Sequence, residues 1–370
     1  MTDSGPFRAD IVGSFLRPQI VTDARQQHAL GQLDDTALTE LEDAAIERLV
    51  QRQADVGLRV ASDGELRRSW WHLDFWEHLD GLEIVDLDHG RQFHGVQTRP
   101  RDVRVANKIA FPASHPFVDS FRHLDRAAQA AGVTPKITLP APTVLDFRLD
   151  DSRVDAATYH DREDLTEDLV QAYRDALQAL YNVGARYIQL DDTAWGYLCS
   201  DTEIAKAKAR GLHTDGIATR YASMINAVLD GRPDDLVVTT HVCRGNFRSA
   251  WVASGGYEPV ADALLGGTGY DGFFLEYDTD RAGSFEPLRF LPDGPQRVVL
   301  GLITSKHGEL ESPDTIKRRI EEATAYVPLD QLALSPQCGF ASTEEGNLLS
   351  EAQQWEKIRA VVSIAHDVWD

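Results

Sequence analysis

The sequence predicts an α/β fold, specifically a TIM (β/α)8 barrel with a hairpin-containing segment inserted after the second strand. Eight short apolar runs rich in β-formers alternate with longer amphipathic stretches of helical pattern. Near-continuous apolar strands are typical of a parallel sheet covered on both faces. No Gly-rich phosphate turn follows the first run, where Val12-Gly-Ser-Phe-Leu-Arg-Pro18 stands instead. This absence favours the barrel over a doubly wound open sheet, and we expect one domain over residues 1–370.

The elements follow one another as a repeated strand and helix. The predicted strands cover residues 10–12, 58–62, 136–139, 187–190, 236–240, 272–275, 297–302 and 331–334. The clearest helical patterns cover residues 35–54, 165–182, 203–229, 313–325 and 348–365.

Residues 66–135 are too long for an ordinary strand-to-helix connection. We expect them to form an insertion that carries a β-hairpin over the barrel mouth. The insertion begins with an aromatic cluster, which predicts either a small satellite core or a wall for a flat or apolar substrate: Trp70, Trp71, Phe75 and Trp76.

The chain is strongly acidic, with 37 basic and 59 acidic residues and a formal net charge of −22. This charge argues against nucleic acid or an anionic membrane as a partner. The chain has three cysteines, an odd number and too few for a disulfide framework. This indicates a reducing compartment. With no signal-peptide core and no long apolar run, we expect a cytoplasmic protein. The sequence leaves open a homo-oligomer.

Four metal-ligating side chains stand at the ends of predicted strands. His241 and Cys243 are two residues apart on an extended segment, so their side chains point the same way. Glu276 ends another strand, and Cys338 follows the last one. An imidazole, two thiolates and a carboxylate form a ligand set that suits tetrahedral zinc. Strand ends are where a barrel assembles its active site, so we expect a zinc ion there.

Carboxylates and a Gly-Ser turn end the other strands. Asp191 is a candidate to receive a substrate ammonium group, whereas its neighbour Asp192 points the other way and suits a helix N-cap. Glu65, after Asp63 and Gly64, either binds substrate or pairs with a nearby arginine. Gly13 and Ser14 either bind a substrate carboxylate through their N–H and hydroxyl groups or form a packing turn.

Four further residues have weaker signals. Lys306 and His307 follow the seventh strand, where either side chain is a candidate proton donor to a leaving group. A solvated loop pair is the alternative. Arg17 suits an anion partner or a structural ion pair. Cys199 lies beyond its strand end and suits a buried small hydrophobic residue better than a metal ligand.

Taken together, these segments resemble the cobalamin-independent methionine synthase family, specifically its C-terminal catalytic barrel. The resemblance covers nearly the whole chain in order. It is carried by Val12-Gly-Ser14, Asp63-Gly-Glu65, Ile188-Gln-Leu-Asp-Asp192, His241-Val-Cys-Arg-Gly-Asn246, Glu276, Leu300-Gly-Leu302 and Ser335-Pro-Gln-Cys-Gly339.

The resemblance implies a TIM barrel with one zinc ion. Matched by motif, the zinc ligands are His241, Cys243, Glu276 and Cys338. The residues that fall where the family holds the amino-acid end of homocysteine are Gly13, Ser14, Glu65 and Asp191. The family's proton-donating histidine falls at Lys306, with His307 adjacent.

The chain also departs from the long members of the family. It has about half the length of the two-barrel enzyme, and the family's Asp-Glu-Pro stands here as Asp191-Asp192-Thr193. Residues 141–147 lack the tryptophan that supports the folate ring. The chain therefore resembles the short, single-barrel members, whose methyl donors are mostly not folate or are unsettled.

These observations predict a zinc-dependent thiol alkyltransferase, with catalytic candidates Asp191, Lys306 and His307. The expected partners are a thiol, either homocysteine or a close relative, and an alkyl donor. One alternative is an epoxide–thiol transferase of the coenzyme M type, although a sulfonate thiol would call for basic groups in place of Glu65 and Asp191. A porphyrinogen-type decarboxylase would need no zinc. A purely structural metal would make the chain a binding protein.

Overall fold

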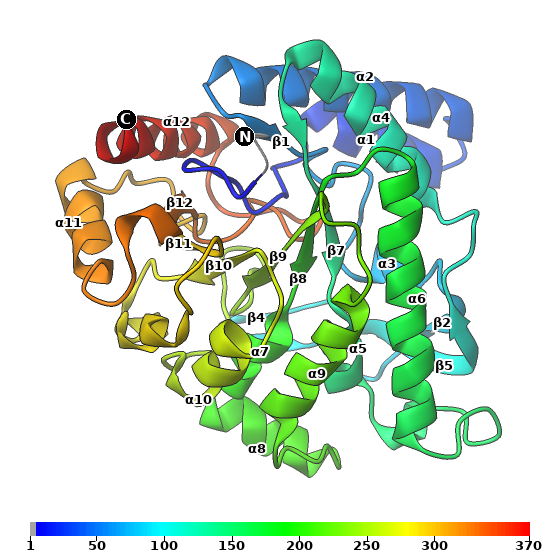
Figure 1. Ribbon diagram of the computed structural model, residues 1–370. Helices are drawn as coiled ribbons and strands as arrows, with labels where there is room; N and C mark the ends of the chain where they lie inside the picture. Colours follow the sequence, from blue (N-terminus) through cyan, green and yellow to red (C-terminus); the bar gives the residue numbers. More distant parts are fainter. Residues whose placement is uncertain (1–4) are drawn as a thin grey trace.

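A six-stranded parallel sheet occupies the centre of the computed structural model, which describes residues 5–370, and helices are arranged around it (Figure 1). The strand order is β12-β11-β10-β9-β8-β7, so each strand pairs with its neighbour in sequence. Every residue of β8, β10 and β12 is buried, as expected for strands covered on both faces. The strands are β7 (Ile137–Pro140), β8 (Tyr187–Asp191), β9 (Val237–Val242), β10 (Gly272–Glu276), β11 (Arg297–Ile303) and β12 (Leu332–Pro336).

Parallel pairing continues beyond both edges of this sheet. Strand β1 (Val60–Ala61) pairs with β6 (Thr134–Pro135), which directly precedes β7. Isolated parallel bridges join Ala9 to Leu334 of β12 and Ser14 to Gly64, just after β1. Residues 9–14 therefore lie between the last strand of the sheet and the turn that follows β1.

The predicted strand at 10–12 is wrong as a continuous strand, because only the bridges at its two flanks form. The Asp10 carboxylate accepts hydrogen bonds from the N–H groups of Phe7 (2.9 Å) and Ile11 (2.7 Å). These local bonds replace ladder bonds at this point. The α/β class and the parallel sheet are confirmed, and the other seven predicted strands match observed ones to within two residues.

One predicted helix is also wrong. Residues 203–229 form two helices, α8 (Asp201–Ala209) and α9 (Ile217–Leu229), in place of one. Gly211 has φ +90° and Gly216 has φ +65°, and a right-handed helix cannot pass through such left-handed residues. The other helices are α1 (Gln19–Ala29), α2 (Asp35–Asp55), α3 (Leu73–Trp76), α4 (Pro116–Ala131), α5 (Pro142–Arg148), α6 (Arg162–Asn182), α7 (Thr193–Leu198), α10 (Glu258–Ala261), α11 (Pro313–Ala323) and α12 (Glu351–Trp369).

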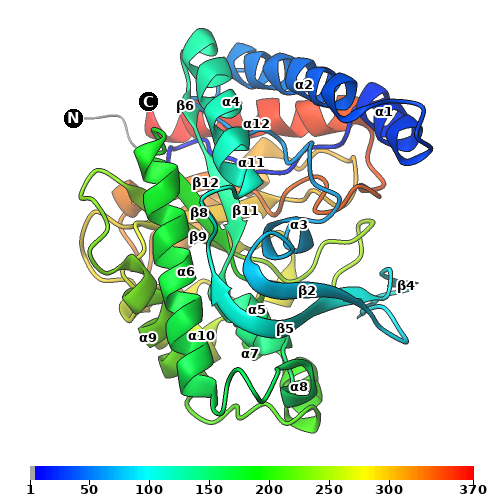
Figure 2. The same cartoon turned by 90° about the vertical axis from the view of Figure 1, so that its right-hand side faces the viewer.

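Antiparallel pairs occupy the long segment between β1 and β6. Strand β2 (Asp80–Asp86) pairs with β5 (Arg101–Ala110), and the short β3 (Gln92–Phe93) pairs with β4 (Val96–Gln97) between them. Figure 2 shows β2 and β5 as a curved ribbon with β4 at its outer end.

The aromatic cluster at the start of this segment lies between the hydrophobic core and a cavity. Phe75 and Trp76 are fully buried in the hydrophobic core, and Trp76 Nε1 donates to Tyr173 Oη at 3.2 Å. Trp70 belongs to the same core, and both Trp70 and Trp71 line a cavity of the molecule. The cluster is therefore part of the large hydrophobic core and not a separate satellite core, and its role as a wall for a substrate stays a prediction. Across residues 5–370, none of the helices has the length and apolar character needed to cross a membrane.

Candidate metal centre and active site

Four potential metal ligands converge at the carboxyl ends of three strands of the central sheet, β9, β10 and β12. His241 lies on β9 and Cys243 directly follows it, Glu276 ends β10, and Cys338 lies two residues after β12. Their ligand atoms all lie within 4.8 Å of one another, and all four residues are buried. The two sulfur atoms are 3.6 Å apart. The register explains this convergence, because parallel strands in sequence order end at the same edge of the sheet.

Several polar atoms of this quartet have no protein partner. Neither ring nitrogen of His241 is hydrogen-bonded, and Glu276 Oε2 is also without a partner. The other oxygen, Oε1, accepts from the backbone N–H of Arg244 at 2.9 Å. Buried polar groups are normally satisfied, so these orphaned atoms fit a cation held between them. A set of two sulfurs, one imidazole and one carboxylate suits zinc.

The charge state of the two cysteines fits the same role. The hydrogen bond from the Cys243 thiol holds the pKa of Cys338 well below that of an ordinary thiol. Burial raises the pKa of Glu276, and the positive charge of Lys306 opposes this rise. A lowered thiol pKa favours the thiolate, and thiolate is the form that binds metals.

Three members of the quartet, His241, Cys243 and Cys338, line a cavity of about 470 Å³, whereas Glu276 does not. The sequence-predicted residues that line it are Ser14, Glu65, Asp191, His241, Cys243 and Cys338. Trp70, Trp71 and Phe247 contribute aromatic surface to the same cavity. Segments far apart in the sequence thus bring carboxylates, sulfur ligands and aromatic rings to one space.

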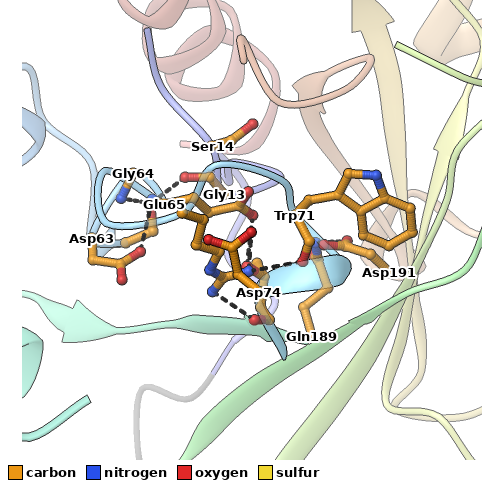
Figure 3. A network of polar contacts seen from close by, with 12 residues as sticks. Gly13, Ser14, Asp63, Gly64, Glu65, Trp71, Asp74, Gln189 and Asp191 are labelled. Atoms are coloured by element: carbon orange, nitrogen blue, oxygen red, sulfur yellow. Dashed lines mark hydrogen bonds and ion pairs between the residues drawn. The ribbon is translucent and has the colours of Figure 1, made fainter. Parts of the chain in front are cut away.

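Glu65 reaches the cavity from a tight turn after β1. Gly64 has φ +67° and Glu65 itself has φ +57°, a left-handed conformation that non-glycine residues seldom adopt. Thr138 Oγ1 donates to Glu65 Oε1 at 2.8 Å, whereas Oε2 is buried without a partner. Burial raises the pKa of Glu65, and the charges of Arg68 and Arg17 oppose the rise. Figure 3 shows Glu65 beside Gly13 and Ser14, with Gln189 and Asp191 nearby.

Ser14 packs against the loop that carries Cys338. The N–H of Phe340 donates to the Ser14 carbonyl at 2.9 Å, and a Cβ on Gly339 would stand 2.0 Å from Ser14 Oγ. Only glycine permits this approach. Gly13 does not itself line the cavity. A Cβ at this position would lie 2.5 Å from the Thr138 methyl group, so the close packing here requires glycine.

The adjacent acids Asp191 and Asp192 have different surroundings. Asp191 lines the cavity, its Oδ1 accepts from Gln189 Nε2 at 2.7 Å, and burial raises its pKa to about 7. Asp192 caps α7 by accepting from the N–H of Ala194 at 2.9 Å. The N-cap predicted for Asp192 is therefore present.

A model of the family described as "Cobalamin-independent synthase, Catalytic domain" matches residues 7–365. The chain belongs to the cobalamin-independent methionine synthase family. It is similar to the uncharacterized protein YxjH of Bacillus subtilis, with 50% identity over 98% of this chain and 95% of that protein.

Solved structures agree with this membership. The chain is similar to a putative vitamin-B12 independent methionine synthase from Listeria monocytogenes, with 39% identity, a TM-score of 0.79 and full coverage of both chains. It also shares its fold with a B12-independent methionine synthase from Shewanella sp. W3-18-1, at 18% identity and a TM-score of 0.70. The latter alignment covers 98% of this chain and 97% of that one.

Besides Gly13 and Glu276, three further residues singled out in the sequence do not line the cavity. His307 is exposed, and Lys306 is buried with Nζ donating to the carbonyl of Gly245 at 3.0 Å. Their predicted role as proton donors stays a prediction. Arg17 donates to backbone carbonyls, including those of Glu65 (2.8 Å) and Arg68 (3.0 Å), which is a structural arrangement.

Cys199 also lies away from the quartet. It is buried, and its Sγ donates to the carbonyl of Trp195 at 3.3 Å. Burial raises its pKa to about 11, so it stays a thiol. This is the small hydrophobic role that the sequence favours for it.

The basic part of the cavity wall was not predicted from the sequence. Arginines from the ribbon, from α5 and its following turn, and from the residue after α8 line the cavity. In the sequence each of these arginines is a single residue among many acidic ones, so no motif marks it as part of a site. They are Arg91, Arg101, Arg148, Arg153 and Arg210.

Proposed function

We propose that this chain is a zinc-dependent thiol alkyltransferase that transfers a methyl group to homocysteine or a related thiol amino acid. The observation that carries the proposal is the buried quartet, whose ligand atoms lie within 4.8 Å of one another at a cavity also lined by Glu65 and Asp191. Family membership supports the methyl transfer. A zinc ion held by His241, Cys243, Glu276 and Cys338 would lower the pKa of a substrate thiol at neutral pH.

The chain's own residues would hold the amino-acid part of the thiol. Glu65 Oε2 has no protein partner and suits a substrate ammonium group, and Asp191 adds a second carboxylate to the same cavity. Ser14 and nearby backbone amides would bind the substrate carboxylate. Two carboxylates favour an ammonium-bearing thiol over a sulfonate thiol of the coenzyme M type, because a sulfonate beside them would be repelled.

The reaction proposed is an in-line displacement. The substrate sulfur, after loss of its proton, supplies the electron pair for the new S–C bond, and the donor leaves with the pair of the broken bond. The cavity walls would align the two reactants and exclude water that competes for the electrophile.

We also propose that residues 9–14, β1 and β7–β12 close into an eight-stranded barrel. The bridges from Ala9 to Leu334 and from Ser14 to Gly64 support it, together with the pairing of β1 with β6. The ribbon of β2 to β5 would then stand over the mouth, since Arg91 and Phe93 line the same cavity as Cys243.

The proposal predicts that purified protein carries about one zinc ion per chain. Cys243→Ser or Cys338→Ser should remove the zinc and the methyl transfer together, because each serine replaces a thiolate with a poor zinc ligand. Metal content is measured by elemental analysis. Cys199→Ser is the matched control, since this buried cysteine lies outside the quartet and should keep full zinc.

Cobalt substitution tests thiol activation separately from metal binding. With Co²⁺ in place of zinc, homocysteine should strengthen the sulfur-to-metal charge-transfer absorption. If both cysteine variants keep full zinc, the metal assignment is wrong. If the cobalt spectrum does not respond to homocysteine, the thiol mechanism is wrong and the metal is structural.

A further inference from the structure

One part of the cavity wall has a charge opposite to that of the whole molecule. Five arginines line it, against two aspartates, Asp102 and Asp150, in the same part of the wall. The complete chain has a formal net charge of −22. A cluster of guanidinium groups in so acidic a protein is a local feature that overall composition does not explain.

Arg148 is the most buried member of the cluster. Its side chain is 12% exposed, and its Nη1 donates to His72 Nε2 at 2.5 Å. The nearest carboxylate, Asp102, is 3.9 Å away. Arg148 Nε and His72 Nδ1 are buried without partners. Burial and, to a smaller extent, the positive charge of Arg91 lower the pKa of Arg148 to about 10.

Arg91 and Arg210 face the same space without close counter-ions. Among residues 5–370, neither guanidinium has a carboxylate oxygen within ion-pair distance; Arg91 Nη1 donates to Tyr197 Oη (3.3 Å) and Arg210 Nη2 to the Phe147 carbonyl (3.1 Å). Arg153 differs, because it pairs with Asp102 at 2.9 Å and with Asp150. Within the described part of the chain, Arg91 and Arg210 therefore have no ion-pair partner, and Arg148 has only the 3.9 Å pair with Asp102. The positive charge of Arg91 acts unfavourably on both Arg148 and Arg210.

We propose that Arg91, Arg148 and Arg210 bind an anionic group, a carboxylate or a phosphate, on the alkyl donor. This inference rests on the proposed function, because it assigns the second substrate of the same cavity. An anion would pair with the three guanidinium groups and relieve their mutual repulsion. Trp70, Trp71 and Phe247 would contact the body of the donor between this anion and the metal quartet.

The lining of the cavity then selects two different partners. Glu65 and Asp191 supply carboxylates that suit an ammonium group, whereas the arginines of the same lining suit an anion. A donor bound through its anionic group is kept from these carboxylates by repulsion. The distribution of charges would thus bind the thiol and the donor at different places in the same cavity.

Isothermal titration calorimetry on the zinc-loaded protein tests the anion site with three small aromatic probes. Benzoate carries a carboxylate, phenyl phosphate carries a phosphate, and benzamide is a neutral molecule of similar shape. We expect at least one of the two anions to bind about tenfold or more tightly than benzamide. Binding of benzoate alone identifies a carboxylate site, and binding of phenyl phosphate alone identifies a phosphate site.

Three substitutions test whether the arginines bind the anion. Arg91→Met, Arg148→Met and Arg210→Met should each weaken the preferred anion by about tenfold, the usual cost of one charged hydrogen bond. Arg104→Met is the matched control, since Arg104 is exposed, pairs with Glu83 at 2.6 Å and lies outside the cavity. Thermal unfolding by circular dichroism shows whether Arg148→Met still folds. Arg210 is exposed and Arg91 has no buried ion pair, so the Arg91→Met and Arg210→Met variants suffice if it does not.

The proposal is overturned if neither anion binds more tightly than benzamide, or if Arg91→Met and Arg210→Met both bind like the wild type. Its failure is distinct from failure of the proposed function, because zinc content and the cobalt response to homocysteine do not depend on the arginines. A normal cobalt response without anion binding refutes only the donor site. Anion binding without a cobalt response refutes only the thiol mechanism.

Discussion

Glu65 combines an unfavourable backbone conformation with a buried carboxylate oxygen that has no protein partner. Its backbone has φ +57°, and its buried carboxylate leaves Oε2 without a partner while Oε1 accepts from Thr138. A left-handed non-glycine residue and an orphaned carboxylate oxygen are both unfavourable in an unliganded protein. A bound ammonium group would offset the second of these costs.

We therefore expect Glu65→Gln to weaken homocysteine without removing the metal. The amide keeps the side-chain volume and an oxygen for Thr138 but loses the negative charge. KM for homocysteine should rise about 10- to 100-fold, as expected for loss of one charged hydrogen bond. Steady-state kinetics measure KM, and elemental analysis should show unchanged zinc.

Glu83→Gln is the control for this substitution, because Glu83 is exposed on β2 and lies outside the cavity. An unchanged KM in Glu65→Gln would remove Glu65 from the substrate site. Loss of zinc in the same variant would show a structural role in the metal centre.

The site residues that stand at strand ends could be predicted from the sequence. His241, Cys243, Glu276 and Cys338 each follow an apolar run, and parallel strands bring such positions to one edge. The arginines were not predictable in this way. Their place in the cavity depends on how the ribbon and the α5 region fold back over the sheet, and no local pattern encodes that tertiary contact.

At the scale of elements, helix α4 is capped by a histidine. His115 Nδ1 accepts from the N–H of Phe117 at 3.3 Å, and Nε2 donates to the carbonyl of Phe75 at 3.1 Å. This pair of bonds requires the neutral ring. The ring also stacks on Phe111 at 4.7 Å, and burial lowers the pKa of His115 to about 4.

The cap predicts a specific acid sensitivity. The unfolded chain binds a proton at His115 near pH 6.5, whereas the folded chain does so only near pH 4. Stability is therefore lost as the pH falls through this window, by up to about 3 kcal/mol. Asparagine is also a good N-cap, so His115→Asn should have a shallower decline of the free energy of unfolding between pH 6.5 and 4.

Urea unfolding at several pH values measures this difference. His213→Asn serves as the control, because His213 is exposed and should leave the slope unchanged. An identical decline in the wild type and His115→Asn would mean that this histidine does not contribute to the acid sensitivity.

Element boundaries were predictable to different degrees for physical reasons. Helix α2 begins at residue 35 as predicted, because Asp34 caps it by accepting from the N–H of Ala37. The break between α8 and α9 was missed because the apolar periodicity continues across Gly211 and Gly216. Periodicity reports which face is buried, whereas glycine backbone conformation decides where a helix stops.

At the scale of the whole molecule, a buried ion pair joins the first residues of the fold to its centre. Lys136 and Asp10 are fully buried, with Nζ 3.2 Å from Oδ1, and Tyr187 Oη donates to Asp10 Oδ2 at 2.9 Å. Lys136 Nζ also lies 3.8 Å from the ring centroid of Phe274 on β10. These contacts connect the segment before β1 with β7, β8 and β10, which supports the proposed closure of the barrel.

We expect Lys136→Met to destabilise the whole fold by about 3–5 kcal/mol, because it leaves the Asp10 carboxylate buried without its counter-ion. The double variant Asp10→Asn with Lys136→Met should recover part of this loss, since no unpaired charge remains. Urea unfolding measures both. Lys108→Met is the control, because Lys108 is 74% exposed in its pair with Asp168 and should change stability by less than about 1 kcal/mol. A Lys136→Met protein as stable as the wild type would show that the ion pair does not hold residues 9–14 against the sheet.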